Sequence, residues 1–243
     1  MSSAHIEPHI KESSYIRDLV FGFGDGINTS LGIVAGVGGA SISADVVILA
    51  ALVGMFTGAK AMAVQNYLAV KSQREILESE IKREESEIES VPDKERQEIE
   101  EIYKAKGFQG DVLKTVVKTI TSNKKVWLKT MLSEELGVNL EIVGNPLRGA
   151  LVMFGSFLVG GILPILPYFI VKAGIISSGT ALGSAIAFSL ISSFTVGAIK
   201  SRIAKKNWLK GGLEMAGLGT GIALIGYGIG AELIKGGIVN TRT

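Results

Sequence analysis

The chain has 243 residues, 31 glycines, a mean hydropathy of +0.38 and a formal net charge of +2. This composition is unusual for a soluble domain and ordinary for a protein that crosses a membrane several times. The lack of cysteine in the sequence excludes disulfides, thiolate metal sites and cysteine nucleophiles. The near-zero net charge gives no reason to expect nucleic acid, and the first residues lack the features of a cleaved signal peptide.

Five segments are apolar enough to cross a bilayer as helices, which takes about 20 residues each. They cover residues 17–40, 46–70, 148–171, 178–200 and 212–235. The sequence therefore predicts an all-α membrane protein with five transmembrane helices. Two prolines in the stretch GGILPILPYFI are expected to break the outer end of the third helix.

The composition changes abruptly between the second and third predicted spans. Residues 71–145 hold 13 of the 25 Lys and Arg and 16 of the 23 Asp and Glu, which is too polar for lipid. We therefore expect three regions: residues 1–70 with the amino-terminal tail and two spans, a water-exposed helical domain at 71–145, and three spans in 146–243.

The short loops predict the orientation, because cytoplasmic loops carry an excess of Lys and Arg. The loop KSRIAKKNWLKGG, between the last two spans, has five basic residues. The loop GGASISAD has none, and VKAGIISSG has one. The amino terminus and the polar domain are therefore predicted to be cytoplasmic, and the carboxyl-terminal NTRT to lie on the other side.

Asp25 interrupts the apolar first span. Helical spacing places it on a face of small and polar residues, and the second span has a similar face that includes Met62. Small residues allow helices to approach closely, so the two faces could meet and bring Asp25 near Met62. Carboxylates inside a membrane are costly and are functional candidates by default. The alternatives are that Asp25 is a helix-end residue at the interface and that Met62 only packs.

The polar domain contains glutamates at helical spacing on both sides of Pro92. Glu84 and Glu87 share one face before the proline, and Glu95 and Glu98 share another after it. Because proline suits the first turn of a new helix, a helical hairpin could present all four carboxylates together.

Met131 and Glu135 lie one helical turn apart later in the same domain. Carboxylates suit Mn²⁺ and Fe²⁺, and a thioether adds softness that does little for Mg²⁺ or Ca²⁺. The alternative is a solvated helix face stabilised by i to i+4 ion pairs, which the spacing alone favours.

The order of several motifs resembles the vacuolar iron transporter family. They are RDLVFGFGDGINTSLGIVAGVGGA, AMAVQNYLAVKSQRE, a Glu-rich stretch, IYKAKG, EELG and SFLVGGILPILPY. The resemblance covers almost the whole chain. It implies a homodimer with five membrane helices per subunit and a cytoplasmic metal-collecting domain. The implied activity is proton-coupled export of Fe²⁺ from the cytosol, with Mn²⁺ as an additional ion and with no prosthetic group. The implied location is the cell membrane in a prokaryote or the vacuolar membrane in a eukaryote.

The resemblance also assigns roles to individual residues. Asp25 and Met62 match the family's membrane carboxylate and thioether, which are expected to line the ion path at the dimer interface. The metal-collecting positions of the cytoplasmic domain match Glu84, Glu87, Glu95, Glu98, Met131 and Glu135.

This chain departs from the family pattern in its second span. Gly54 and Asn66 stand where acidic residues are usual, and Lys60 occupies a normally apolar position. Lys60 is about 15 Å from the predicted cytoplasmic end, which is too far for its side chain to reach water. One hypothesis is that Lys60 pairs with Asp25, although the helical phase turns Lys60 away from Met62. A partner on another span or in the other subunit is the alternative.

Two other functions remain open. The chain could bind or sense divalent metal at the membrane after losing transport, or the insert could be an interaction domain with acidic surfaces. An enzyme is least expected, because the sequence offers no nucleophile and base pair, phosphate-binding loop or histidine metal site.

Overall fold

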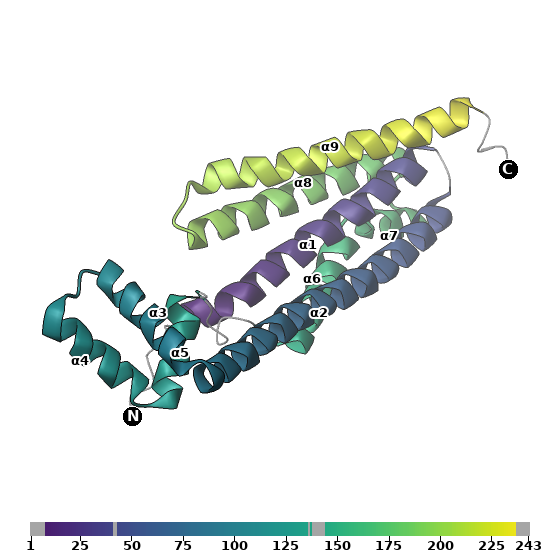
Figure 1. Cartoon of the computed structure of the whole chain (residues 1–243). Coiled ribbons are helices and arrows are strands. Elements are labelled where there is room, and N and C mark those ends of the chain that lie inside the picture. Colours follow the sequence, from purple (N-terminus) through teal and green to yellow (C-terminus); the bar gives the residue numbers. More distant parts are fainter. Residues whose placement is uncertain (1–7, 41–42, 136, 138–143, 237–243) are drawn as a thin grey trace. The chain divides into compact units, whose positions relative to one another are not determined.

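The computed structural model describes residues 8–40, 43–135, 137 and 144–236, and every regular element in them is a helix (Figure 1). The helices are α1 (Pro8–Gly39), α2 (Ala44–Ser90), α3 (Pro92–Ala105), α4 (Gly110–Thr121), α5 (Lys124–Glu134), α6 (Pro146–Ile162), α7 (Leu166–Lys172), α8 (Ser178–Ile203) and α9 (Trp208–Lys235). The carboxyl-terminal NTRT and the first seven residues of the tail lie outside the described residues.

Four helices are long and apolar enough to cross a membrane: α1 from Ser14 onward, α2, α8 and α9. The pair α6 and α7 makes a fifth span if it is counted as one, with a bend of 45° between its halves. Pro164 lies in the break and Pro167 lies in the first turn of α7. The break is therefore where the sequence predicts it, since a proline removes a backbone hydrogen bond.

Helix α2 is longer than any bilayer requires. Its 47 residues extend for about 70 Å at 1.5 Å per residue, against roughly 30 Å for a hydrocarbon core. The sequence has no glycine or proline between residues 59 and 91, so nothing in it interrupts the helix where the composition turns polar. The second predicted span and the first polar segment are thus one helix.

The chain forms two compact units. Residues 12–67 and 146–243 make up the first, called here the membrane unit; residues 1–11 and 68–145 make up the second, called the insert unit. The core of the membrane unit contains Met55, Phe157 and Tyr168. Helices α8 and α9 of the same unit lie side by side (Figure 1). The core of the insert unit is built from α2, α3, α4 and α5 and is centred on Ile99 and Trp127.

Glycines set the closest helix contacts of the membrane unit. A Cβ atom at Gly230 of α9 would lie 2.1 Å from the carbonyl oxygen of Gly36 of α1, so the two backbones touch. The small-residue face of α1 therefore packs on α9 at this position. On α2, a Cβ at Gly54 would lie 2.2 Å from Ile33 of α1, and one at Gly58 would lie 2.7 Å from the ring of Phe157.

The expected meeting of the two small-residue faces is therefore wrong at these glycines. The physical reason is that α9 has its own glycines four residues apart, Gly226 and Gly230, which let its backbone approach α1. The glycines of α2 instead accommodate bulky side chains from α1 and α6.

Candidate metal centre

A single residue joins the end of α2 to the start of α3. Val91 has a non-helical backbone (φ −133°, ψ 50°), and Pro92 follows as the first residue of α3. The Val91 carbonyl accepts hydrogen bonds from the backbone N–H groups of Lys94 (3.0 Å) and Glu95 (3.3 Å). Proline suits this position because its missing N–H would have no partner there. The short link keeps the glutamates on the two helices close in space.

Three glutamates gather at this hairpin. Glu84 and Glu87 on α2 and Glu95 on α3 each offer one carboxylate oxygen, and these oxygens lie within 4.8 Å of one another. Glu84 and Glu95 are each only 1% exposed. Three oxygen ligands from two helices are a donor set that hard and borderline divalent cations prefer.

The buried carboxylates have few neutralising contacts. Neither oxygen of Glu95 accepts a hydrogen bond from the described residues, and the same holds for Oε1 of Glu84. The Nζ atom of Lys94 is 4.0 Å from Glu95 but only 2.9 Å from Glu98, which is the better paired of the two. A buried charge without a partner is costly. The cluster is therefore suited to a cation that would neutralise it.

The electrostatics of the site reflect this excess of negative charge. Burial raises the pKa of Glu84 to about 7, with further contributions from the carboxylates of Glu135, Glu95 and Glu87. The pKa of Glu95 is also raised, by burial and then by Glu98. Partial burial and then Glu98 raise the pKa of Glu135. The five glutamates singled out in the sequence are thus brought close enough to influence one another's protonation.

Met131 belongs to the hydrophobic core of the insert unit. It is fully buried on α5, in one cluster with Ile88 and Ile99. These two isoleucines each lie one helical turn beyond a buried glutamate, Glu84 and Glu95 respectively. Packing accounts for the burial of Met131, and its part as a metal ligand stays a prediction.

The two predicted membrane ligands lie on different helices of the membrane unit. Asp25 is half-buried on α1, and it has no hydrogen bond or ion pair with any described residue. Met62 is half-buried on α2 and packs against the core cluster of this unit. Their joint role at an ion path stays a prediction.

Lys60 does not pair with Asp25 within the described part of one chain. Its side chain is exposed on α2, and no acidic side chain among the described residues lies within ion-pair distance of it. The simple pairing hypothesis is therefore wrong for a single chain. The step of two residues from Lys60 to Met62 is a rotation of about 200°, so Lys60 lies on the face of α2 opposite Met62.

A second buried carboxylate in the membrane unit was not identified from the sequence. Asp18 is 2% exposed and pairs with Arg17 at 3.0 Å. A Cβ atom at Gly149 would lie 2.8 Å from Oδ2 of Asp18 and 3.1 Å from Nδ2 of Asn66, so both polar groups lie close to the backbone of α6 at Gly149. The available signal was the spacing of seven residues between Asp18 and Asp25, which places them on one face of α1.

Fold and site together define a helical, polytopic membrane protein that carries a cluster of buried carboxylates able to hold a divalent cation. A family model described as the VIT family matches residues 16–231. The chain belongs to this family.

Named relatives agree with that assignment. A vacuolar iron transporter 1 of Tulipa gesneriana is 31% identical over 215 residues, covering 88% of this chain and 85% of the relative. A vacuolar iron transporter of Plasmodium falciparum is 32% identical, covering 94% of this chain and 86% of the relative. A vacuolar iron transporter of Toxoplasma gondii is 31% identical, covering 96% of this chain and 79% of the relative.

Proposed function

We propose that the chain is a proton-coupled transporter that exports Fe²⁺, and also Mn²⁺, from the cytosol. Membership of the VIT family indicates a membrane transporter rather than an enzyme, and the relatives' names specify iron. The observation that carries the proposal is the convergence of three glutamate oxygens within 4.8 Å in a buried, poorly neutralised site.

In the proposed mechanism, the insert unit is cytoplasmic and captures the ion. Glu84, Glu87 and Glu95 supply oxygen ligands, and Glu98 and Glu135 extend the negative field around them. Capture favours the deprotonated carboxylates, so it releases protons when the site binds its ion. Met131 would add a thioether that favours Fe²⁺ and Mn²⁺ over Mg²⁺.

The ion then passes to a path in the membrane unit that contains Asp25 and Met62. The support for this step is that Asp25 has no competing partner among the described residues, so its carboxylate is available to an ion. Protonation of Asp25 from the far side would weaken its hold on the ion and release it. One carboxylate thus serves as ligand and as proton carrier. The proposal includes a homodimer in which this path lies between the subunits.

A second candidate is a membrane-anchored protein that binds or senses divalent metal without transporting it. The observation that favours it lies in the second span, where Lys60 is exposed and Gly54 and Asn66 replace acidic residues usual in the family. In this case the insert unit would still bind metal, and only the passage through the membrane would be lost.

The test is ion flux into liposomes that contain the purified full chain, under an imposed pH gradient. We expect Fe²⁺ and Mn²⁺ uptake that depends on the gradient and that falls to the level of protein-free liposomes in Asp25→Asn. A matched control is Asp45→Asn, because Asp45 is an exposed acid at the start of α2 that pairs with Lys172 at 2.7 Å. Asp45→Asn should keep its flux.

The same measurement separates the two candidates. Flux retained by Asp25→Asn would refute the role of this residue. An absence of flux in the unmodified chain, with metal still bound in solution, would support the binding or sensing protein instead.

A further inference from the structure

Helices α3 and α4 of the insert unit line a cavity that is open to solvent and whose charged side chains are exposed. Its volume is about 490 Å³, within the range of small-molecule sites, roughly 300 to 1,000 Å³. Arg96 and Glu100 line it from α3, one helical turn apart, and Lys114, Val117 and Lys118 line it from α4. The cavity thus has three cationic side chains and one carboxylate, and neither the family assignment nor the proposed transport accounts for it.

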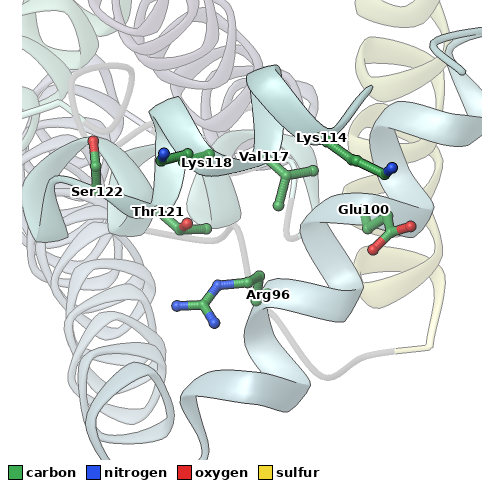
Figure 2. Close-up of a pocket in the computed structure, with 7 residues that line it drawn as sticks. All are labelled: Arg96, Glu100, Lys114, Val117, Lys118, Thr121 and Ser122. Atoms are coloured by element: carbon green, nitrogen blue, oxygen red, sulfur yellow. The ribbon is translucent and has the colours of Figure 1, made fainter. Parts of the chain in front are cut away.

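The charged groups divide the cavity into two ends (Figure 2). The guanidinium of Arg96 and the ammonium of Lys118 point to the same end, where the Thr121 hydroxyl also lies. Lys114 and Glu100 lie at the other end, with Val117 between the two groups. One end therefore attracts an anion, whereas the other offers both a donor and an acceptor.

The cationic groups are available to a ligand. Lys118 forms no hydrogen bond or ion pair with the described residues. Arg96 is 3.3 Å from Asp93, and Lys114 is 3.4 Å from Asp111, but these carboxylates are 97% and 99% exposed. Ion pairs this exposed contribute little and are easily exchanged.

Arg96 is also held in place by the core of the unit. Its guanidinium lies over the ring of Trp127, 5.8 Å from the ring centroid, and Trp127 is buried. This cation–π contact restricts the side chain, and apart from the Nη1 atom that donates to Asp93 its N–H groups are available to bind. A positioned guanidinium beside an ammonium and a hydroxyl is a donor set suited to phosphate oxygens.

We propose that this cavity binds a small molecule that carries a phosphate group and hydroxyls. The phosphate lies between Arg96 and Lys118, with the Thr121 hydroxyl as a further donor. The hydroxyl-bearing body extends past Val117 to Glu100, which accepts hydrogen bonds from it, and Lys114. The molecule is either soluble in the cytosol or the headgroup of a membrane lipid, since both share this chemistry.

The proposal is tested by isothermal titration of the detergent-purified full chain with inorganic phosphate and with ribose 5-phosphate. We expect both to bind, and ribose 5-phosphate to bind more tightly. The double variant Arg96→Gln/Lys118→Gln should weaken both by about tenfold or more, because it removes two charge-assisted contacts. Glu100→Gln should weaken ribose 5-phosphate alone.

The matched control is Lys125→Gln/Lys129→Gln, which removes two exposed charges from α5 of the same unit. It should bind as the unmodified chain does. Unchanged melting temperature and Mn²⁺ binding show that each variant is folded. The proposal is overturned if the unmodified chain binds neither probe, or if the cavity variant and the control bind equally.

The source of the ligand is tested with nanodiscs of phosphatidylcholine, with or without phosphatidylinositol phosphate. Displacement of ribose 5-phosphate by the phosphoinositide identifies a lipid headgroup as the ligand. Retained binding identifies a soluble one. Because none of these measurements involves flux, their result is independent of the transport proposal.

Discussion

The insert unit and the membrane unit surround their buried carboxylates differently. In the insert unit, Glu84 and Glu95 are buried beside other carboxylates, and the pKa of each is raised. In the membrane unit, Asp18 is buried beside Arg17 and the amide of Asn66. The difference teaches that burial alone does not indicate a metal site. A surplus of negative charge at a buried position does indicate a metal site, because a bound cation would neutralise it.

The most direct test of this comparison is to remove the excess negative charge from the insert unit. The double variant Glu84→Gln/Glu95→Gln should lower the affinity of the full chain for Mn²⁺ by at least the roughly 10- to 100-fold that losing an outer-shell contact costs. Titration with Mn²⁺ measures this. Glu78→Gln, an exposed position on the same helix, is the control.

The same variant should make the metal-free chain more stable at pH 8, because it replaces repelling carboxylates with neutral amides of similar size. The melting temperature in the presence of a chelator measures this. A lower melting temperature together with an unchanged affinity would show that the glutamates only support the fold.

In the membrane unit, stability depends on close helix contacts at glycines rather than on the charge of buried carboxylates. Gly230→Ala places a Cβ 2.1 Å from the carbonyl oxygen of Gly36, and overpacking of this kind costs about 1–3 kcal/mol. Gly228→Ala on the same helix meets no atom within 4 Å and is the control. Unfolding in detergent should distinguish the two variants, and equal stabilities would contradict the close approach of α1 and α9.

The protonation of the glutamates gives a smaller and graded effect. Because the pKa of Glu84 is raised from 4.5 to about 7, metal must displace a proton below pH 7. Affinity for Mn²⁺ should therefore fall as the pH drops, by about tenfold per pH unit for each proton displaced.

The stability of the metal-free insert unit should change in the opposite sense. Folded Glu84 holds its proton up to about pH 7, whereas the unfolded chain loses it near 4.5, so stability decreases as the pH rises between these values. Melting curves across this range test the sign. A rise in stability with pH would mean that other groups dominate the titration.

The smallest effect is expected at Lys60. It lies on the exposed side of α2 and pairs with no described acid, so Lys60→Leu should change flux by less than about twofold. Liposome flux at several pH values measures this. A large change with a shifted pH profile would instead reveal pairing with Asp25 across a subunit boundary.

Local patterns in the sequence predicted the helices well. Hydropathy located the candidate spans, and the prolines located the break between α6 and α7. The three-residue spacing of the glutamates and Pro92 predicted the hairpin, because both depend on neighbours in sequence. The contacts of α1 with α9 were not predictable, since many faces in this chain are rich in small residues.

The part of the site that sequence missed depends on contacts between distant helices. Asp18 and Asn66 both lie close to Gly149 of α6, where a larger residue would clash with them. That contact could not be read from spacing. The pairing of Lys94 with Glu98 is different, because it is an i to i+4 pair within α3 of the kind that spacing indicates, and it leaves Glu95 poorly neutralised.

The one-residue link at Val91 also determines where this chain can change length. Inserting or deleting one residue there would change the direction in which α3 leaves α2 and would separate Glu95 from Glu84. The connection between α3 and α4 is different, because Gly107 and Gly110 have positive φ angles and open space around them. Insertions and deletions among related chains should therefore be absent between residues 87 and 95 and permitted near residue 108.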